Sequence, residues 1–371
     1  MGTTFTGAAV FDGTSLDPDA ELYIAGGIVM DSGAGETVRL DGGYILPGLV
    51  DLQVNGGDGL MVCGQTKVAD LHRICDAQAR LGSTGILPTL ITDTAEATDA
   101  VIRAGIQAVQ QNLPGFLGLH LEGPHLDPRR KGAHDPALIR QMTDADLNRL
   151  CDAARQLPSL MVTLAPENAS SKQIAALASA GAVVSLGHTD CRMETAGRSF
   201  AAGATCVTHL FNAMSQLGNR EPGLVGAALS APVFAGLIAD GIHVLPEVIR
   251  IAISAKPEGV FLVSDCMAAA GTDATEFLLG GRRILRRDGR LTLEDGTLAG
   301  ADLSLPQAIR VMAHQVGVPL YRAFAMATSI PASCLNRHDV GRLQPGSRAD
   351  FIHLDSGLAL RGVWRGGQRI H

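Results

Sequence analysis

Short apolar runs alternate with longer segments of helical period through the middle of this sequence. Each repeat has a run rich in Leu or β-branched residues, then a polar turn, then an amphipathic stretch of about 10 to 15 residues. This alternation predicts an α/β fold in which helices cover a parallel sheet. About eight such runs are present, the number that closes a (β/α)8 TIM barrel. The predicted strands are Leu49–Val54, Gly85–Thr89, Phe116–Leu121, Met161–Ala165, Val183–Gly187, Cys206–His209, Phe234–Ala239 and Val260–Ser264.

The clearest helical patterns lie between these strands. They cover Val68–Leu81, Asp144–Gln156 and Pro246–Ala255, and Leu305–Val316 is the helix expected after the last strand. A doubly wound open sheet is the competing arrangement. That fold often carries a Gly-rich dinucleotide fingerprint after a strand, and none follows a strand here. The barrel is therefore the favoured architecture.

The two ends of the chain have a different pattern. Residues 1–46 and 344–371 carry short strands separated by Gly and Asp-Gly turns, with no convincing helix. Each segment is too short to bury a core alone, so we expect the two to form one small β-sandwich domain beside a barrel domain of residues 47–343. A further hairpin is expected where Asp288-Gly289 separates two alternating runs.

The composition of the chain indicates which partners and which cellular compartment to expect. The net charge is −7 and the isoelectric point is near 5.9, with no long Lys/Arg run, which argues against nucleic acid as a partner. No apolar stretch approaches the roughly 20 residues of a membrane span. The seven cysteines lack a CxxC pair, and the N-terminal residues lack signal-peptide character. These features predict a cytoplasmic protein whose thiols are free core residues.

Four polar residues end apolar runs in the predicted barrel: Glu122, His188, His209 and Asp265. Strand ends of a barrel meet at one mouth, and a charge there is costly to bury unless it is paired or binds metal. One Glu and two His with an open fourth position suit catalytic zinc. A zinc ion held in this way lowers the pKa of bound water until hydroxide forms near neutrality, and Asp265 is placed to move its proton. Such a site hydrolyses amides.

Each of these residues also has a structural interpretation. A single His or Glu at a strand end is more often a helix cap or a neighbour's partner than a ligand, but four at matched positions favour a site. The other candidates are assigned structural roles. His72 and His314 lie in helical patterns, His353 and His371 in the terminal strands, and Asp51 is a strand-end carboxylate. His120 shares a strand face with Glu122 and is expected to point inward without being the main ligand.

The motifs resemble those of the N-acetylglucosamine-6-phosphate deacetylases of the amidohydrolase superfamily. The strings PGLVDLQVNG, HLEGPHLDPRRKGAH, GHTD, THLFNAM, NREPGLVG, IADGIHV and LVSD occur in the order of that family. The resemblance implies deacetylation of N-acetyl-D-glucosamine 6-phosphate to D-glucosamine 6-phosphate and acetate. It implies Glu122, His188 and His209 as metal ligands and Asp265 as the general acid/base. The residues implied to contact substrate are Ala133, His134, Asn212, Ala213, Arg220, His243, Leu298, Ala299 and Gly300.

Arg220 and His243 offer donors suited to a phosphate group. In enzymes similar to this one the arginine can come from a neighbouring subunit, so the resemblance also implies a homodimer. The alternative is structural: Arg220 pairs with Glu221 or another surface carboxylate, and His243 caps the helix opening at Pro246.

The sequence departs from the superfamily pattern at two places. Gln53-Val54-Asn55 stands where many amidohydrolases have His-x-His, and amides are poor zinc ligands, so we expect one divalent ion per chain. Zinc is the expected ion, although Fe, Mn and Co accept the same ligands. CMAAAGTD follows the strand that ends at Asp265 without the Pro expected there, which leaves the shape of that loop open.

Two other functions stay open at this point. An amidohydrolase for cyclic amides or N-acyl amino acids usually keeps His-x-His and often a bridging lysine, and no lysine ends a strand here. A non-catalytic barrel scaffold has no need of the complete set formed by Glu122, His188, His209 and Asp265.

Overall fold

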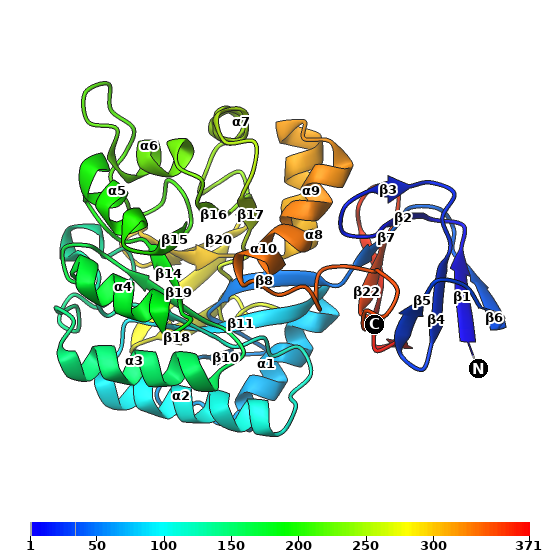
Figure 1. Cartoon of the computed structure of the whole chain (residues 1–371), viewed down its shortest axis with the longest axis horizontal. Helices are drawn as coiled ribbons and strands as arrows, with labels where there is room; N and C mark the ends of the chain where they lie inside the picture. Colours follow the sequence, from blue (N-terminus) through cyan, green and yellow to red (C-terminus); the bar gives the residue numbers. More distant parts are fainter. Residues whose placement is uncertain (1, 34) are drawn as a thin grey trace.

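The computed structural model describes residues 2–33 and 35–371. A barrel of parallel strands and outer helices lies beside a smaller unit of sheets that holds both ends of the chain (Figure 1). The eight barrel strands follow one another around the sheet in chain order. They are β8 (Leu49–Val54), β11 (Ser83–Ile91), β12 (Leu119–Glu122), β13 (Leu160–Leu164), β14 (Val183–Leu186), β15 (Ala204–Val207), β16 (Phe234–Leu237) and β17 (Val260–Leu262). The predicted barrel is confirmed, with strand bounds shifted by a few residues.

The first and last barrel strands meet just beyond the end of β17. Asp265 N donates to the Gln53 carbonyl at 3.0 Å, and Asn55 N donates to the Cys266 carbonyl at 2.9 Å. A parallel bridge also joins Val54 to Cys266. The barrel is thereby nearly closed, and this contact places Gln53 and Asn55 next to Asp265.

Helices cover the outside of the barrel. They are α1 (Val68–Arg80), α2 (Ala95–Gln110), α3 (Asp144–Gln156), α4 (Ser171–Ser179), α5 (Met193–Ala201), α6 (Gly223–Ser230), α7 (Pro246–Ala255), α8 (Leu305–Val311), α9 (Leu320–Met326) and α10 (Ser329–Cys334), with a 3-10 turn at Pro128–Arg130. The start of α3 is fixed by a capping box between Thr143 and Asp146. The helix predicted over Leu305–Val316 is α8 followed by a π-helical turn, Met312–Val316.

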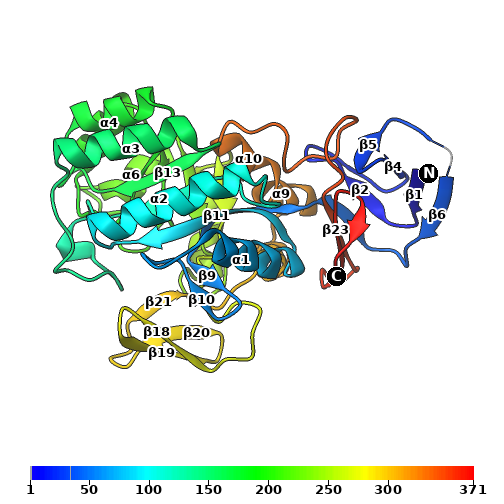
Figure 2. The same cartoon turned by 90° about the horizontal axis from the view of Figure 1, so that it is seen from below.

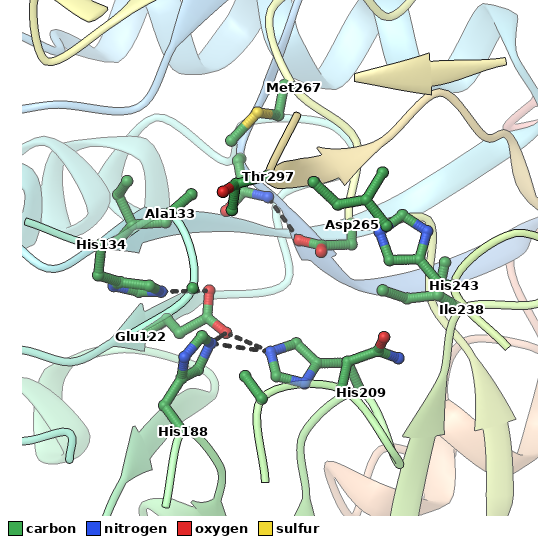
Figure 3. Close-up of a pocket in the computed structure, with 17 residues that line it drawn as sticks. Glu122, Ala133, His134, His188, His209, Ile238, His243, Asp265, Met267 and Thr297 are labelled. Atoms are coloured by element: carbon green, nitrogen blue, oxygen red, sulfur yellow. Dashed lines mark hydrogen bonds and ion pairs between the residues drawn. The ribbon is translucent and has the colours of Figure 1, made fainter. Parts of the chain in front are cut away.

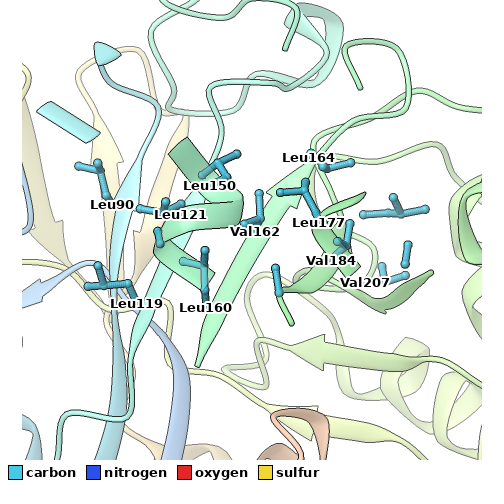
Figure 4. Close-up of a cluster of buried hydrophobic side chains, with 14 of the residues drawn as sticks. Leu90, Leu119, Leu121, Leu150, Leu160, Val162, Leu164, Leu177, Val184 and Val207 are labelled. Carbon is cyan, nitrogen blue, oxygen red and sulfur yellow. The ribbon is translucent and has the colours of Figure 1, made fainter. Parts of the chain in front are cut away.

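Apolar side chains between strands and helices form the main core (Figure 4). Leu119 and Leu121 of β12 are buried there, together with Leu150 of α3 and Leu177 of α4. Each such leucine contributes about 1.5–3 kcal/mol through burial. Because successive strand residues point to opposite faces, packing Leu119 and Leu121 outward turns His120 and Glu122 into the barrel. The core thus aims the polar residues of β12 inward.

The chain ends form two further sheets. One has the order β5-β4-β1-β6 and the other β24-β23-β22-β7-β2-β3. Their strands are β1 (Gly2–Thr6), β2 (Ala9–Phe11), β3 (Leu16–Asp17), β4 (Leu22–Ala25), β5 (Ile28–Met30), β6 (Gly35–Arg39), β7 (Tyr44–Pro47), β22 (Phe351–Leu354), β23 (Leu360–Arg365) and β24 (Gln368–Arg369). Phe5, Phe351 and Trp364 pack between them, with the last two rings stacked at 4.6 Å. The expected β-sandwich from the two termini is confirmed.

An antiparallel sheet projects from the barrel between β17 and α8, beside the short strands β9 (Gly56–Gly57) and β10 (Leu60–Met61) (Figure 2). Its strands are β18 (Glu276–Leu279), β19 (Arg282–Arg287), β20 (Arg290–Leu293) and β21 (Leu298–Ala301). Asp288 and Gly289 have φ of 51° and 70°, as the tight turn of a two-residue hairpin requires. The predicted hairpin is confirmed as the centre of this sheet. In the described part of the chain, no helix is long and apolar enough to cross a membrane.

Candidate active site

The four polar residues predicted from strand ends converge at the carboxyl end of the barrel (Figure 3). Glu122 is the last residue of β12, whereas His188, His209 and Asp265 lie two or three residues beyond β14, β15 and β17. These three have left-handed backbone, with φ of 46°, 29° and 49°. Non-glycine residues adopt that conformation at a cost of about 1–3 kcal/mol and concentrate at functional sites. The strained backbone that these three residues share indicates a functional site at this end of the barrel.

Three ligand atoms form a nearly equilateral triangle. Glu122 Oε1 lies 3.3 Å from His188 Nε2 and 3.1 Å from His209 Nε2, and the two nitrogens are 3.0 Å apart. Tetrahedral zinc with N and O ligands at about 2.0–2.1 Å would hold such atoms roughly 3.3–3.4 Å apart. The carboxylate and the two imidazoles therefore fit a divalent ion in both spacing and chemistry.

Hydrogen bonds prepare these side chains to act as ligands. His188 Nδ1 donates to the Arg130 carbonyl at 2.8 Å, so in the neutral ring Nε2 carries a free lone pair. His209 Nδ1 is buried and has no partner among the described residues. Burial alone would raise the pKa of Glu122, but the close contacts of its carboxylate with the rings of His188 and His209 hold it well below its usual range. The carboxylate is thus ionised and ready to bind a cation.

His134 also points at Glu122, with Nε2 3.9 Å from Oε2. The ligand atoms of Glu122, His134 and His188 lie within 4.8 Å of one another, so a second set of three exists. Thr92 N donates to His134 Nδ1 at 3.2 Å, which places the proton of the neutral ring on Nε2. Burial, reinforced by the neighbouring His188 ring, lowers the pKa of His134 to about 3. A neutral ring with Nε2–H is a donor, which favours His209 as the third ligand.

Two amides lie beside the carboxylates. Gln53 Nε2 donates to Glu122 Oε1 at 3.1 Å, and Asn55 Nδ2 donates to Asp265 Oδ1 at 2.7 Å. Burial and then the negative charge of Glu122 raise the pKa of Asp265 to about 6. An acid with a pKa near neutrality is suited to take up and release a proton. Asn55 fixes the orientation of that acid.

A cavity of about 260 Å³ opens onto these groups. Of the residues implied to contact substrate, it is lined by Ala133, His134, Asn212, Ala213, His243, Leu298 and Gly300. Ala299 is buried beside Met267 in a small apolar cluster, and it is not among the described residues that line the cavity. The lining also includes Ile91, Ile238, Met267 and Thr297, which no sequence pattern had singled out, because single apolar or small residues carry no chemical signal.

Arg220 is exposed and is likewise not among the described lining residues. The expected pairing of Arg220 with Glu221 is not found, because the Glu221 carboxylate is paired with Arg192 instead. His243 does line the cavity. Its Nδ1 donates to Asp240 at 2.6 Å, and no side-chain cap from His243 to α7 is found in the described structure. Asp240 was missed in the sequence, although it belongs to the same IADGIHV string.

The other histidines and Asp51 were assigned structural roles, and only His371 departs from its assignment, because it lies beyond β24, the last strand. His120 points inward, as expected, and is held by Leu52 and Thr163; burial lowers its pKa to about 4. Asp51 lies within β8 and accepts from the backbone N–H groups of Gln53 and Ser264. His353 donates to the Gly42 carbonyl between the terminal segments. His72 and His314 are exposed.

Comparison with known proteins agrees with the geometry. A family model described as "Amidohydrolase family" matches residues 44–370, so the chain belongs to the amidohydrolase family. It is 37% identical over 335 residues to the N-acetylgalactosamine-6-phosphate deacetylase of Shewanella sp. (strain ANA-3), which covers 90% of this chain and 84% of the relative. It is 32% identical over 339 residues to the N-acetylglucosamine-6-phosphate deacetylase of Haemophilus influenzae, covering 89% and 88%. Within the amidohydrolases the chain therefore belongs to the family of these sugar-phosphate deacetylases.

Solved structures support the same relationship. The crystal structure of N-acetylglucosamine-6-phosphate deacetylase from Pasteurella multocida superposes with a TM-score of 0.95 at 29% identity, covering 100% of this chain and 99% of the other. A mutant of the Mycobacterium smegmatis enzyme, in complex with N-acetyl-D-glucosamine-6-phosphate, superposes with a TM-score of 0.90 at 31% identity, covering 100% and 98%.

Proposed function

We propose that this protein removes the acetyl group from N-acetyl-D-glucosamine 6-phosphate, giving D-glucosamine 6-phosphate and acetate. The observation that carries the proposal is the arrangement of one cavity. Glu122, His188 and His209 form a ligand triangle, and Asp265, with its raised pKa, opens onto the same space. A plain binding scaffold would not need both groups. The N-acetylgalactosamine 6-phosphate epimer is the second candidate, because the Shewanella relative is 37% identical.

The triangle of Glu122 Oε1, His188 Nε2 and His209 Nε2 would hold one divalent ion, with zinc favoured by the ligand types. Such an ion supplies a positive charge that lowers the pKa of water and polarises a carbonyl oxygen. Asp265 accepts the proton of the attacking water and then delivers it to the amide nitrogen of the leaving amine. Asn55 keeps the Asp265 carboxylate in place for both transfers.

His134 is suited to bind the acetyl oxygen. Its Nε2–H points into the cavity, since Thr92 occupies Nδ1. A neutral donor at this position stabilises the negative charge that develops on that oxygen during attack. Burial keeps the pKa of His134 low, so the ring is neutral near pH 7. The neutral ring donates a hydrogen bond from Nε2 and does not act as an acid.

The phosphate end of the substrate is assigned to His243, Asn212 and Ala213, all of which line the cavity; Ala213 would contribute its backbone N–H. Burial would raise the pKa of Asp240, but the hydrogen bond from His243 lowers it, so an ionised Asp240 orients the ring. Arg220 is exposed on its own chain. We therefore assign its phosphate contact to a second copy of the chain, which makes the active form a homodimer.

All seven cysteines are free thiols and six of them are buried, which supports the cytoplasm as the compartment of this reaction. Acetate release from N-acetylglucosamine 6-phosphate, N-acetylgalactosamine 6-phosphate and the two unphosphorylated sugars tests the function. We expect both phosphorylated sugars to react much faster than their unphosphorylated counterparts, and the glucosamine derivative fastest. Turnover of cyclic amides or N-acyl amino acids, with none of these sugars cleaved, would contradict the proposal.

A further inference from the structure

Four polar side chains are buried inside the barrel, on β12, β13, β14 and directly after β15. His120, Thr163, Ser185 and Thr208 are all buried, with at most 4% of each residue exposed. Inward-facing layers of such barrels are usually built from Val, Ile and Leu. Polar groups in that position are costly unless every one is hydrogen-bonded. A polar layer at this depth therefore calls for a functional reason.

These side chains form a hydrogen-bonded chain whose direction follows from the chemistry. The Leu52 carbonyl can only accept, so His120 Nδ1 donates to it at 3.0 Å, and Nε2 of the neutral ring accepts. Thr163 Oγ1 donates to that nitrogen at 2.7 Å and has no second proton. Thr208 Oγ1 must then donate to Thr163 at 2.7 Å, and Ser185 Oγ to Thr208 at 2.6 Å. Each hydroxyl or ring proton in this chain therefore has a single acceptor.

Each link of this chain lies next to a residue of the active site, and Thr163 is the register partner of Glu122 on the neighbouring strand β13. His120 precedes Glu122 by two residues on the same face of β12, Thr208 directly precedes His209, and Ser185 precedes His188 by three residues. At the far end, Leu52 directly precedes Gln53, whose amide donates to Glu122. The chain therefore ties together the strands that carry all three ligand atoms.

We propose that Thr208 and Thr163 are positioning residues, which set the spacing of Glu122, His188 and His209 without touching ion or substrate. This inference rests on the proposed ligand set and deepens it. Residues that orient metal ligands typically change metal affinity by about 10- to 100-fold when mutated. Because these hydroxyls act through the barrel strands and not on a ligand atom, we expect a loss near the lower end of that range.

Thr208→Val tests the inference, because it removes the hydroxyl that donates to Thr163 and accepts from Ser185. Thr208→Ser keeps the hydroxyl and should restore binding. Thr328→Val is the matched control: Thr328 is fully buried and donates to the Phe324 carbonyl at 2.7 Å, outside the chain of hydrogen bonds. Zinc dissociation constants come from competition with a chromogenic chelator, and the visible spectrum of Co²⁺-loaded protein reports ligand geometry.

We expect Thr208→Val to bind zinc about 10-fold more weakly and to change the Co²⁺ spectrum, with Thr208→Ser close to wild type. Thr328→Val should lower the unfolding temperature but leave affinity and spectrum unchanged. Wild-type affinity and spectrum in Thr208→Val, or an equal loss of affinity in Thr328→Val, would overturn the inference. Should Thr208→Val fail to fold, Ser185→Ala removes only the first donor of the chain. A weaker zinc affinity in Ser185→Ala supports the inference, and an unchanged zinc affinity overturns it.

The measurement uses no sugar, so its outcome is separate from that of the proposed function. A wild-type protein that binds no divalent ion would contradict the proposed metal site itself. A wild-type protein that binds zinc, with Thr208→Val binding it equally well, contradicts only the positioning role.

Discussion

The side-chain amide of Gln53 donates to the Glu122 carboxylate, with Nε2 3.1 Å from Oε1. Asn55 makes the same kind of contact with Asp265 at 2.7 Å. Both amides thus turn N–H groups toward the carboxylates, on the side where many amidohydrolases carry His-x-His. Since N–H groups repel a cation, we expect one tightly bound ion per chain, which elemental analysis of dialysed protein can count. A count close to two would show that other groups complete a second site.

The variant with both Gln53→His and Asn55→His sharpens this test. It replaces two donors by imidazoles that have lone pairs to offer, so the metal count should rise above one. An unchanged count would mean that something other than these amides limits the site to one ion.

Variants of the three histidines distinguish between the two possible ligand sets. His188→Ala and His209→Ala should lose both the ion and the activity. His134→Ala should keep the ion while the rate falls by about 10²–10³-fold, the usual effect of removing one oxyanion donor. Metal content and acetate release, measured on the same preparations, check this. If His134→Ala loses the ion and His209→Ala retains it, His134 is the ligand.

The barrel and most of the residues of this site could be predicted from the sequence, and the reason is physical. Apolar runs mark buried strands, and a polar residue at the end of such a run, as in Glu122 or His188, must face the barrel mouth. The chain from Ser185 to His120 gives no such signal, because its contacts depend on the register between strands. Neither Asp240 nor the exposed position of Arg220 follows from any local pattern, and Leu298 and Gly300 were reached through family resemblance alone.

Asp265→Asn keeps the size of the side chain and its contact with Asn55 but cannot carry a proton. The rate should fall by about 10²–10⁴-fold, the contribution of general acid/base catalysis. Metal content should stay near that of the wild type, since Asp265 lies outside the ligand triangle. Loss of the ion in this variant would show that the main role of Asp265 is to bind the metal.

The pH dependence of kcat/KM should show an acidic limb set by Asp265. The carboxyl must be ionised to accept a proton, so activity falls as pH decreases through its pKa. Burial, followed by the charge of Glu122, raises this pKa to about 6, whereas a bound cation favours the ionised form. We therefore expect a midpoint between about pH 4, the ordinary aspartate value, and pH 6. Bound metal must be measured at each pH. A midpoint above pH 7 with metal retained would exclude Asp265 as the group that sets the acidic limb.

The last prediction concerns the phosphate of the substrate. Arg220 is exposed on its own chain, and Glu221, one of the partners expected for it, is paired with Arg192. We therefore expect the Arg220 guanidinium to be available to a second copy of the chain. Arg220→Ala should remove a charge-assisted contact of about 1.5–3 kcal/mol. That corresponds to a roughly 10- to 150-fold loss in kcat/KM for N-acetylglucosamine 6-phosphate, with little change for the unphosphorylated sugar and no loss of metal.

Arg198→Ala is the matched control for this variant. Arg198 is an exposed arginine on α5 that pairs with Glu194, and it lies outside the proposed phosphate site. Its removal should leave the preference for phosphorylated sugar intact. The mass of the protein in solution, from light scattering, shows whether a second copy is present to supply Arg220. A monomer that still prefers the phosphorylated sugar would show that His243 and the groups beside it hold the phosphate without help from a neighbour. Equal specificity constants for the two sugars in the unmutated enzyme would remove the phosphate site altogether.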